Sequence, residues 1–531
     1  MPETPTFASA ACAAPHSLAA QAGRDVLAEG GNAVEAMVAM AASIAVVYPH
    51  MNGIGGDGFW LVHSPGGRVR GIEACGPAGR LATPERYRAL GHDRIPSRGP
   101  EAALTVAGAV GGWALALELA KSLGGRLPVA RLLEPAIRHA REGCPVSASE
   151  ARTVPNEIAA LHDAPGFAET FLVDGRTPEA GTVRRLPALA ATLQHLADAG
   201  LDDYYRGDVG REIAADLDRV GAPVTRADLK DFHARVAAPL SLRVRDATLY
   251  NMPPPTQGLA SLLILGMFEH LGVARAEGVA HVHGLVEASK RALAIRDRVV
   301  TDPARGADVA AWLDPRLIAR EAAAIDMRRA APFPPPPPGD GDTVWMGAID
   351  RDGVAVSYIQ SIYWEFGSGV VLPRTGINWQ NRGISFSLDP RALNVLAPGM
   401  KPFHTLNPPL AVLDDGRVVS YGSMGGDGQP QFQAQLFTRY ATFGMGVADA
   451  VDAPRFLFGR TWGADSVTLK VEDRFEPGLV ADLRRLGHEV EELGGSYIDA
   501  LGHAGLMVRH PRDGRVEAAH DPRSDGGAEG L

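Results

Sequence analysis

The sequence has few cysteines and no excess of basic residues. Its three cysteines, Cys12, Cys75 and Cys144, are too few and too far apart for a disulfide framework or a four-cysteine zinc site. Its 52 Lys and Arg residues against 62 Asp and Glu residues give a net charge of −10, and the basic residues are scattered. These features exclude an extended nucleic-acid-binding or anionic-membrane surface. We therefore expect a small-molecule partner.

A long hydrophobic run and an export signal are also missing. The most apolar segment, Ala33 to Val47, is interrupted by Glu35 and is shorter than the roughly 20 residues that a membrane span needs. Near the N-terminus, Glu3 stands where a signal peptide would carry Lys or Arg, and Pro2 and Pro5 precede any apolar stretch. The sequence predicts no membrane anchor, and together with the few cysteines it predicts a cytoplasmic location.

What is present is the composition of a globular protein, with 46% hydrophobic residues and one strong internal break. The break is the segment 331–342, whose prolines, glycines and aspartates form neither a helix nor a central strand, so we expect an exposed connector there. Before it, apolar residues at mixed spacings of three and four predict helices, and strands are fewer, such as 59–63. The predicted helices cover residues 18–47, 103–123, 129–142, 187–198, 258–271 and 281–300.

After the connector the pattern changes to β-type. The runs 343–349 and 354–362 flank the turn sequence Asp350 to Gly353 and predict a hairpin whose first strand opens with Thr343. Further strands are predicted at 409–413 and 418–421, and helices at 431–440 and 477–486. Helices around an antiparallel sheet core indicate a layered α+β fold.

Common cofactor and nucleophile motifs find little support. The glycine-rich segment 53–58 has the spacing of a dinucleotide fingerprint, but a helix precedes it and a strand follows, so we interpret it as a tight helix-to-strand turn. His50, His281 and His283 have no cysteine or carboxylate at ligand spacing and no HExxH pair, so we expect no metal and no cofactor. No Gly-x-Ser-x-Gly motif indicates a Ser-His-Asp triad.

Thr343 offers another route to a nucleophile, because it is the hydroxyl residue at which the connector meets a strand. If the peptide bond before it were cut, Thr343 would carry both a hydroxyl and a free α-amine. An α-amine has a pKa of about 7.7–8.0, so near neutral pH it can accept the hydroxyl proton. One residue would then supply nucleophile and general base. The alternative is a Thr chosen only for its β propensity.

Six segments, in order along nearly the whole chain, resemble the γ-glutamyltranspeptidase family of N-terminal-nucleophile hydrolases. The resemblance implies a four-layer αββα fold made as a precursor that cuts itself after Asp342. Residues 1–342 would form the large subunit and 343–531 the small one, together one intertwined catalytic domain. The segments are Gly30 to Ala36, Gly53 to Phe59, Pro253 to Gly258, Glu287 to Pro303, Phe366 to Gly369 and Gly422 to Gly426.

The resemblance also implies roles for individual residues. Thr343 is the nucleophile, and Ser361 stands where the family has a hydroxyl residue that helps to hold the nucleophile and its amine. Tyr363 replaces the usual Asn. The pair Gly425 and Gly426 resembles the backbone donors of the oxyanion hole, which stabilise the charge that develops during acyl transfer. Without the resemblance this pair would be interpreted as a glycine-rich turn.

The departures from the family concern substrate binding. Glu73 stands where γ-glutamyl enzymes have an Arg for the substrate α-carboxylate, and Ser385 stands where they have an acid for the α-amine. Arg382 replaces a polar uncharged residue and suits a carboxylate, although simple surface solvation is its alternative. His404 and Thr405 replace a Ser-Ser pair, and His404 could donate to an anionic substrate. We expect γ-glutamyl compounds to bind poorly.

This combination is most similar to the oxamate amidohydrolase branch of the family. It predicts hydrolysis of a small carboxylated amide, oxamate to oxalate and ammonia, through an acyl-enzyme on Thr343. The alternatives are a γ-glutamyltranspeptidase or glutathione hydrolase, a related acylase, and a non-catalytic protein whose proline-rich connector docks as a polyproline II ligand. A homodimer of the cleaved heterodimer stays open.

Overall fold

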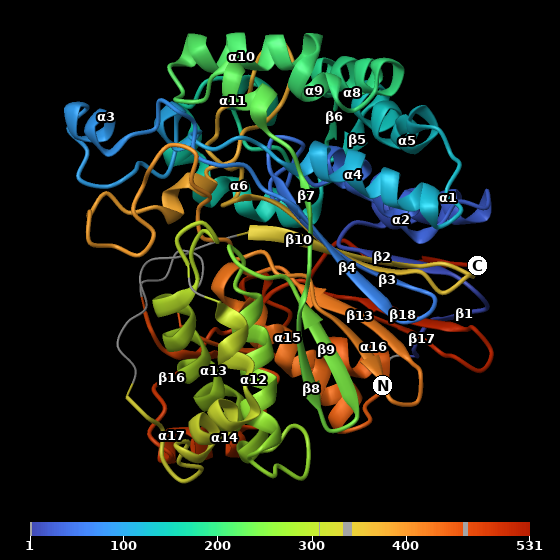
Figure 1. Cartoon of the computed structure of the whole chain (residues 1–531), viewed down its shortest axis with the longest axis vertical. Helices are drawn as coiled ribbons and strands as arrows, with labels where there is room; N and C mark the ends of the chain where they lie inside the picture. Colours follow the sequence, from blue (N-terminus) through green and yellow to red (C-terminus); the bar gives the residue numbers. More distant parts are fainter. Residues whose placement is uncertain (1–2, 307, 333–341, 460–465) are drawn as a thin grey trace.

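Two antiparallel sheets packed face to face, with helices on both outer faces, make up the computed structural model (Figure 1). The structure describes residues 3–306, 308–332, 342–459 and 466–531. Most of the predicted connector therefore lies outside the described residues. The layers run helices, sheet, sheet, helices from top to bottom of Figure 1, which confirms the predicted αββα fold.

The first sheet carries the hairpin that begins with the predicted nucleophile. Its third strand, β10 (Asp342–Ile349), pairs with β11 (Ala355–Tyr363) on one side and with β2 (Ala11–Ala14) on the other. The order continues through β11 to β3, β4 and β7, and β19 lies beyond β2. The bounds of these outer strands are Asp57–Ser64 for β3, Arg68–Ala74 for β4, Arg235–Ala237 for β7 and Gly527–Gly530 for β19.

The second sheet lies below the first and is also antiparallel, in the order β1-β18-β17-β13-β12-β9-β8. Strand β13 in its centre ends at Ser423, just before the glycine pair 425–426. The bounds are Thr6–Phe7 for β1, Val516–His520 for β18, Ala504–Arg509 for β17, Val418–Ser423 for β13, Leu410–Leu413 for β12, Ala247–Asn251 for β9 and Leu240–Val244 for β8.

Helices cover the two outer faces. The upper layer contains α1 Ser17–Ala28, α2 Ala33–Val47, α4 Ala109–Ser122, α5 Val129–Glu142, α6 Ala148–Leu161, α8 Pro187–Ala199, α9 Asp203–Arg206, α10 Asp208–Val220 and α11 Arg226–Asp231. The lower layer contains α12 Gly258–Glu269, α13 Val279–Val299, α14 Pro315–Ala323, α15 Gln429–Phe437, α16 Val447–Asp452 and α17 Pro477–Arg485. Short elements complete the described chain: α3 Pro84–Ala89, α7 Phe167–Phe171, β5 Cys144–Pro145, β6 Val183–Arg184, β14 Phe456–Phe458, β15 Leu469–Val471 and β16 Val490–Glu492.

Apolar side chains fill each space between layers. Trp60 and Trp113 belong to the core between the upper helices and the first sheet, and Trp345 and Met507 to the core between the sheets. Leu263 belongs to the core between the second sheet and the lower helices. Burial of such large side chains is the main force that holds the layers together, at roughly 25 cal/mol per Å² of apolar surface. This packing fixes the position of the two sheets, and so of the ends of their central strands, relative to each other.

One predicted helix is in fact two. The expectation of a single helix over 18–47 was wrong, because α1 ends at Ala28 and α2 begins at Ala33. Gly30 adopts a positive φ of 84° between them, and Asn32 caps α2 in a capping box with Glu35. The glycine-rich segment 53–58 does connect α2 to β3, as the helix-to-strand interpretation predicted.

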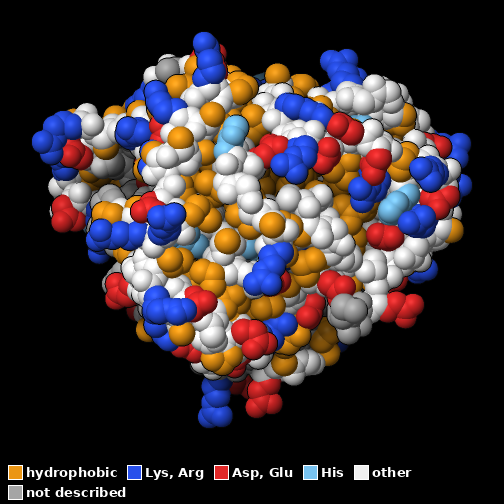
Figure 2. All heavy atoms as spheres, turned by 90° about the horizontal axis from the view of Figure 1, so that it is seen from below, with side chains coloured by type: hydrophobic (Ala, Val, Ile, Leu, Met, Phe, Trp, Pro, Cys, Tyr) orange, Lys and Arg blue, Asp and Glu red, His pale blue; other side chains and the backbone are white. Residues whose placement is uncertain are grey.

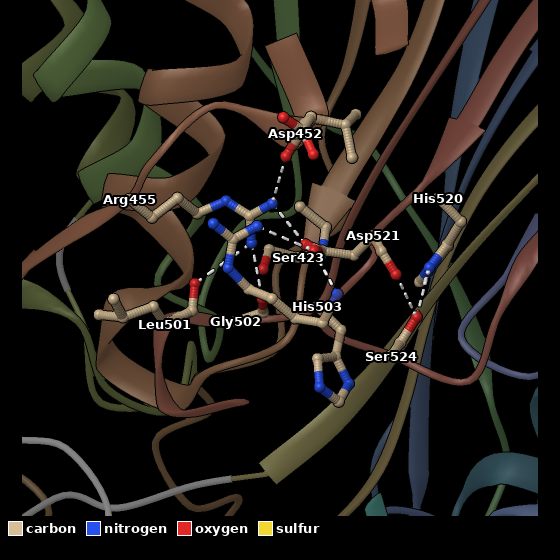
Figure 3. A network of polar contacts seen from close by, with 12 residues as sticks. Ser423, Asp452, Arg455, Leu501, Gly502, His503, His520, Asp521 and Ser524 are labelled. Atoms are coloured by element: carbon tan, nitrogen blue, oxygen red, sulfur yellow. Dashed lines mark hydrogen bonds and ion pairs between the residues drawn. The ribbon is translucent and has the colours of Figure 1, made fainter. Parts of the chain in front are cut away.

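A buried ionic network ties the C-terminal strands to the lower layer (Figure 3). Arg523 donates from all three of its nitrogens, to Glu472, Asp521 and the Ala453 carbonyl. Arg455 contacts Asp521 and donates to the Leu501 and Gly502 carbonyls, and Figure 3 shows its guanidinium turned toward that loop. Its Nε has no hydrogen-bond partner in the part of the chain that the structure describes. The network joins segments far apart in the sequence.

Side chains of opposite charge are mixed on one face of the molecule. Figure 2 shows the face at the bottom of Figure 1, where Lys and Arg side chains alternate with Asp and Glu and no broad field of one sign forms. Such mixing does not favour a polyanion such as nucleic acid. Among the described residues, no helix combines the length and the apolar character that crossing a bilayer requires.

Candidate active site

A β-bulge displaces Thr343 from the regular ladder of the hairpin. Val344 pairs with Gln360, whereas Asp342 pairs with Tyr363, so Thr343 lies opposite two residues of β11 rather than one. Bulges of this kind re-aim side chains and are common beside active sites. Thr343 thus lies opposite the bulge at the N-terminal end of β10, with its side chain fully buried.

The Thr343 hydroxyl lies among polar groups. It forms a hydrogen bond of 3.3 Å with the Ser361 hydroxyl, and the Gln429 side-chain amide donates to it at 3.5 Å. The Tyr363 N–H in turn donates to the Ser361 oxygen at 2.8 Å. Ser361 is therefore held beside the nucleophile, where the resemblance placed it.

Tyr363 ends β11 in a conformation that a non-glycine residue seldom adopts. Its φ is +84°, in the left-handed region, and such strain concentrates at functional sites. The Arg382 guanidinium stacks on its ring, with Cζ 3.6 Å from the ring centroid. This stacking connects the nucleophile's hairpin to the loop that supplies Arg382.

Arg382 is buried, not solvated at the surface, so that alternative is wrong. It begins the short 3₁₀-helix Arg382–Ser385 and is 1% exposed. Its Nη1 donates to the Thr405 hydroxyl at 3.2 Å, whereas Nε and Nη2 have no hydrogen-bond partner among the described residues. Burial lowers its pKa to about 10, so it remains a cation at neutral pH.

His404 faces a buried carboxylate. Its Nε2 lies 3.1 Å from Oδ2 of Asp57, and both side chains are fully buried. Oδ1 of Asp57 accepts the N–H groups of Gly108 at 2.9 Å and Gly76 at 3.3 Å, which fix the carboxylate. Burial raises the pKa of Asp57 to about 7 against the opposing effect of Arg382, and burial lowers the pKa of His404 well below its usual value.

The glycine pair completes the site from the second sheet. Gly425 has a φ of +116°, and a Cβ there would lie 2.7 Å from the Phe432 ring, so only glycine fits. The side-chain amide of Gln257 donates to the Gly426 carbonyl at 2.8 Å and to the Thr405 carbonyl at 2.7 Å. It thereby joins the glycine turn to the loop of His404.

These contacts bring most of the predicted residues into one connected set. It runs from the nucleophile through the stacked arginine to the glycine turn: Thr343, Ser361, Tyr363, Arg382, Thr405, Gln257 and Gly426. One series of contacts thus connects the Thr343 hydroxyl with the loop of Arg382 and with the glycine turn.

One predicted binding residue lies differently from the expectation. Glu73 makes a two-pronged ion pair with Arg235, with both contacts at 2.9 Å, and a second pair with Lys401. Its charge is compensated, so the expected direct repulsion of a substrate carboxylate needs revision. It lines a separate hollow of about 420 Å³ together with Arg235 and Thr301. Ser385 keeps a buried Oγ that forms no hydrogen bond within the described ranges.

Sequence reasoning missed four residues that position the site. All four are buried, and three of them fall inside segments that carry the family resemblance: Asp57, Gln257 and Arg296, with Gln429 outside. Arg296 holds the Oε1 of Gln257 at 2.7 Å and contacts Asp427 at 2.5 Å. Their partners come from distant strands and loops, which spacing along the chain cannot show.

A possible metal site in the described residues consists of His283, Glu287 and His488, whose donor atoms lie within 4.8 Å of one another. The two imidazoles are joined by a hydrogen bond of 2.7 Å, and the Lys290 ammonium lies 2.7 Å from Oε1 of Glu287. A cation so close to the carboxylate opposes metal binding by charge repulsion. Glu287 also accepts the Ala331 N–H, so we interpret the group as a clamp on residues 326–331.

With this geometry in place, comparison with known proteins identifies the family. The sequence profile described as gamma-glutamyltranspeptidase matches residues 19–531. The chain belongs to the gamma-glutamyltranspeptidase family of N-terminal-nucleophile hydrolases. The oxamate amidohydrolase proenzyme of Klebsiella pneumoniae subsp. pneumoniae is 54% identical over 98% of both chains. The glutathione hydrolase-like YwrD proenzyme of Bacillus subtilis is 39% identical over 97% of both.

A solved structure supports the same assignment. The cephalosporin acylase from Bacillus halodurans superimposes with a TM-score of 0.92 at 32% sequence identity, covering 100% of this chain and 97% of the other. A family that includes proteins named for such different substrates shares a fold, and substrate choice must lie in the residues of the individual sites.

Proposed function

We propose that this family member cuts itself before Thr343 and then hydrolyses oxamate, or a closely similar carboxylated amide, to the dicarboxylate and ammonia. The 54% identity to an oxamate amidohydrolase proenzyme over nearly the full length supports the substrate. The buried Thr343–Ser361 pair at the bulge supports the nucleophile.

We infer the substrate class from a cluster of buried polar atoms that have no hydrogen-bond partners in the described chain. The cationic ones are Nε and Nη2 of Arg382, which are fixed by stacking on Tyr363 and by Thr405. A buried guanidinium fork without a carboxylate is matched by a carboxylate ligand in two-pronged geometry. Asp57 and His404, which interact electrostatically with Arg382, also carry such atoms. So do three residues close to Arg382 in the sequence: Asn378, Gln380 and Ser385.

Self-cleavage needs only the groups at the bulge. The Thr343 hydroxyl attacks the carbonyl carbon of Asp342, the C–N bond breaks, and the acyl group moves from nitrogen to oxygen. Water then hydrolyses the ester, which leaves a carboxylate on Asp342 and a free α-amine on Thr343. Ser361, 3.3 Å from the hydroxyl, orients it for this attack.

Turnover reuses the same hydroxyl. The α-amine takes the hydroxyl proton as Oγ1 attacks the amide carbonyl, and the amides of Gly425 and Gly426 receive the developing oxyanion. The amine then passes the proton to the departing nitrogen, and ammonia leaves. A water molecule, deprotonated by the amine, attacks the oxalyl ester and releases oxalate. Because the carboxylate of oxamate adjoins the scissile carbonyl, its contact with Arg382 orients the acyl group for Thr343.

The cleavage is tested by a denaturing gel and N-terminal sequencing. We expect fragments 1–342 and 343–531, one uncut band for Thr343→Ala, and slower cutting with residual turnover for Thr343→Ser as the matched control, because a hydroxyl remains. A small fragment with a different first residue would refute the assignment.

The substrate is tested by comparing ammonia release from oxamate with p-nitroaniline release from a γ-glutamyl anilide. We expect oxamate to be preferred by at least about 100-fold in kcat/KM, because a site built around one buried cation leaves the α-ammonium of a γ-glutamyl group without a partner. Preference for the anilide would instead assign a glutathione hydrolase activity.

A further inference from the structure

The pair formed by Asp57 and His404 has a geometry that the reaction above does not use. We propose that the two side chains share one proton, that this proton turns Nδ1 of His404 from a hydrogen-bond acceptor into a donor, and that the donor form binds the carboxylated substrate. This inference rests on the proposed function, because it assigns the pair to the same acyl pocket.

The contacts of the Asp57 carboxylate determine which of its oxygens faces His404. Oδ1 of Asp57 is occupied by two backbone N–H groups, so Oδ2 is the atom that meets His404, 3.1 Å from Nε2. The approach is not aligned for a straight N–H···O bond, and a small rotation of the ring would align it. Nδ1 of His404, at the opposite side of the ring, has no hydrogen-bond partner among the described residues although the side chain is fully buried.

Two protonation states follow from this arrangement. When the pair has lost its proton, the Asp57 carboxylate accepts from Nε2–H of a neutral imidazole, and Nδ1 presents a lone pair. When the pair gains one proton, Nε2 is occupied by the Asp57 hydroxyl or by its own hydrogen, and Nδ1 carries a hydrogen in either case. The added proton therefore appears as a donor on the far side of the ring.

The donor form suits the neighbouring cation. His404 precedes Thr405, which holds Nη1 of Arg382, and Arg382 contributes to lowering the pKa of His404. A carboxylate held by the two unpartnered nitrogens of Arg382 would gain a further donor from Nδ1–H but would be repelled by a lone pair. Binding of the anion is then coupled to uptake of one proton.

The surrounding ionisable groups do not change charge near neutral pH. Burial raises the pKa values of the tyrosines near Asp57 and of Cys75, so these groups remain neutral. Arg382 stays a cation, and the pKa of Lys401 is raised by its charged neighbours against the effect of burial. The charged and titratable groups that face the pair are Arg382, Lys401, Cys75, Tyr204, Tyr205 and Tyr358.

The kinetic test follows KM for oxamate from pH 5.5 to 9 in the cleaved enzyme. In the wild type we expect KM to rise about tenfold per pH unit above neutrality, as the binding-competent fraction falls. Loss of the proton from the Thr343 α-ammonium frees the general base and raises kcat as pH rises. The titration of the amine is therefore read from kcat, and that of the Asp57–His404 pair from KM. Asp57→Asn should flatten KM to within about twofold across the range, because the Asn amide donates to Nε2 and fixes Nδ1 as a donor.

Glu212→Gln is the matched control, because it removes one negative charge from an exposed ion pair with Arg374 that contacts neither Asp57 nor His404. It should retain the slope of KM against pH. His404→Gln, which lacks the two-sided ring, should raise KM at pH 6 and also lose the slope. A steep slope in Asp57→Asn, or a flat one in Glu212→Gln, would overturn the proposal.

A binding measurement separates this inference from the proposed function. Calorimetry of oxalate binding at pH 8, in two buffers with different ionisation enthalpies, should show uptake of close to one proton by the wild type and none by Asp57→Asn. Oxamate turnover without proton uptake would refute the pair alone. Proton uptake without any oxamate turnover would refute the proposed substrate and leave the pair standing.

Discussion

Two buried arginines, Arg523 and Arg382, differ in the groups that accept their hydrogen bonds. Arg523, in the C-terminal ionic network, is fully buried and gives all three nitrogens to Glu472, Asp521 and a backbone carbonyl. Arg382, beside Thr343, is equally buried but donates to one hydroxyl and lies on an aromatic ring. The first arginine is satisfied within the folded chain, and the second keeps donors available for a ligand.

The difference shows how a buried charge can be assigned to stability or to binding. A buried ion pair that is broken leaves an uncompensated charge, which destabilises a fold strongly. A buried cation whose nitrogens have no carboxylate already costs stability in the free protein, and binding of an anion recovers that cost. We therefore expect mutations of the two arginines to have separable effects.

The largest effect should come from Arg523→Met. It leaves Glu472 and Asp521 buried without their shared partner, and we expect a loss of about 3–5 kcal/mol in the free energy of unfolding. Equilibrium unfolding of the uncut Thr343→Ala precursor measures it, with Arg512→Met, at an exposed position, as the control. In the cleaved enzyme, the fraction that remains folded should keep kcat/KM within about twofold. Unchanged stability would show that the network is not structural.

Arg382→Met should have the opposite profile. We expect kcat/KM for oxamate to fall about 100-fold, which corresponds to about 3 kcal/mol, because the charge-assisted contact with the carboxylate is lost. The unfolding temperature should stay equal or rise, since a desolvated cation is removed. A fall in stability as large as that of Arg523→Met would place both arginines in the same class.

Asp57→Asn should change stability in a pH-dependent manner. The pKa of Asp57 is raised to about 7 in the folded protein, above that of an unfolded chain, so ionisation opposes folding. The protonated form stabilises the fold at low pH, and this stability is lost as pH rises through about 7. The variant should therefore unfold a few degrees above the wild type at pH 8 and at the same temperature near pH 4. An equal difference at both values would contradict the raised pKa.

The smallest effect should come from the ring under Arg382. Tyr363→Phe keeps the aromatic face, so we expect kcat/KM to change by less than about twofold, whereas Tyr363→Leu removes the cation–π contact and should cost about fivefold, near 1 kcal/mol. Steady-state kinetics with oxamate measures both. Equal losses in the two variants would show that the hydroxyl, not the ring face, matters.

Much of the fold was accessible from the sequence because helices and hairpins depend on local patterns. The predicted helix over 129–142 is α5, and the predicted hairpin is β10 and β11. The hairpin of β8 and β9 was missed, because its five-residue strands are short and only every second side chain is fully buried. Only the pairing of β9 with β12, far along the chain, adds this hairpin to the second sheet.

In the candidate site, too, some residues could be predicted from the sequence, whereas their contacts with distant residues could not. Thr343, Ser361 and the glycine pair follow from a resemblance over ordered segments, and the structure brings them together. Asp57 was included in a glycine-rich turn, but its meeting with His404 joins positions 57 and 404 through three-dimensional packing. The ion pairs of Glu73 with Arg235 and Lys401 were hidden for the same reason.

The order of strands has a consequence for the lifetime of the cleaved protein. Strands β10 and β11, which follow the proposed cut, lie between β2 and β3, which precede it, and β19 lies beyond β2. The precursor can refold as one chain, whereas two interleaved fragments would have to find each other in solution before either completed a sheet. Self-cleavage would thus turn unfolding into an irreversible event. The mature enzyme's durability would then be set by how slowly it opens, not by the equilibrium that its precursor obeyed.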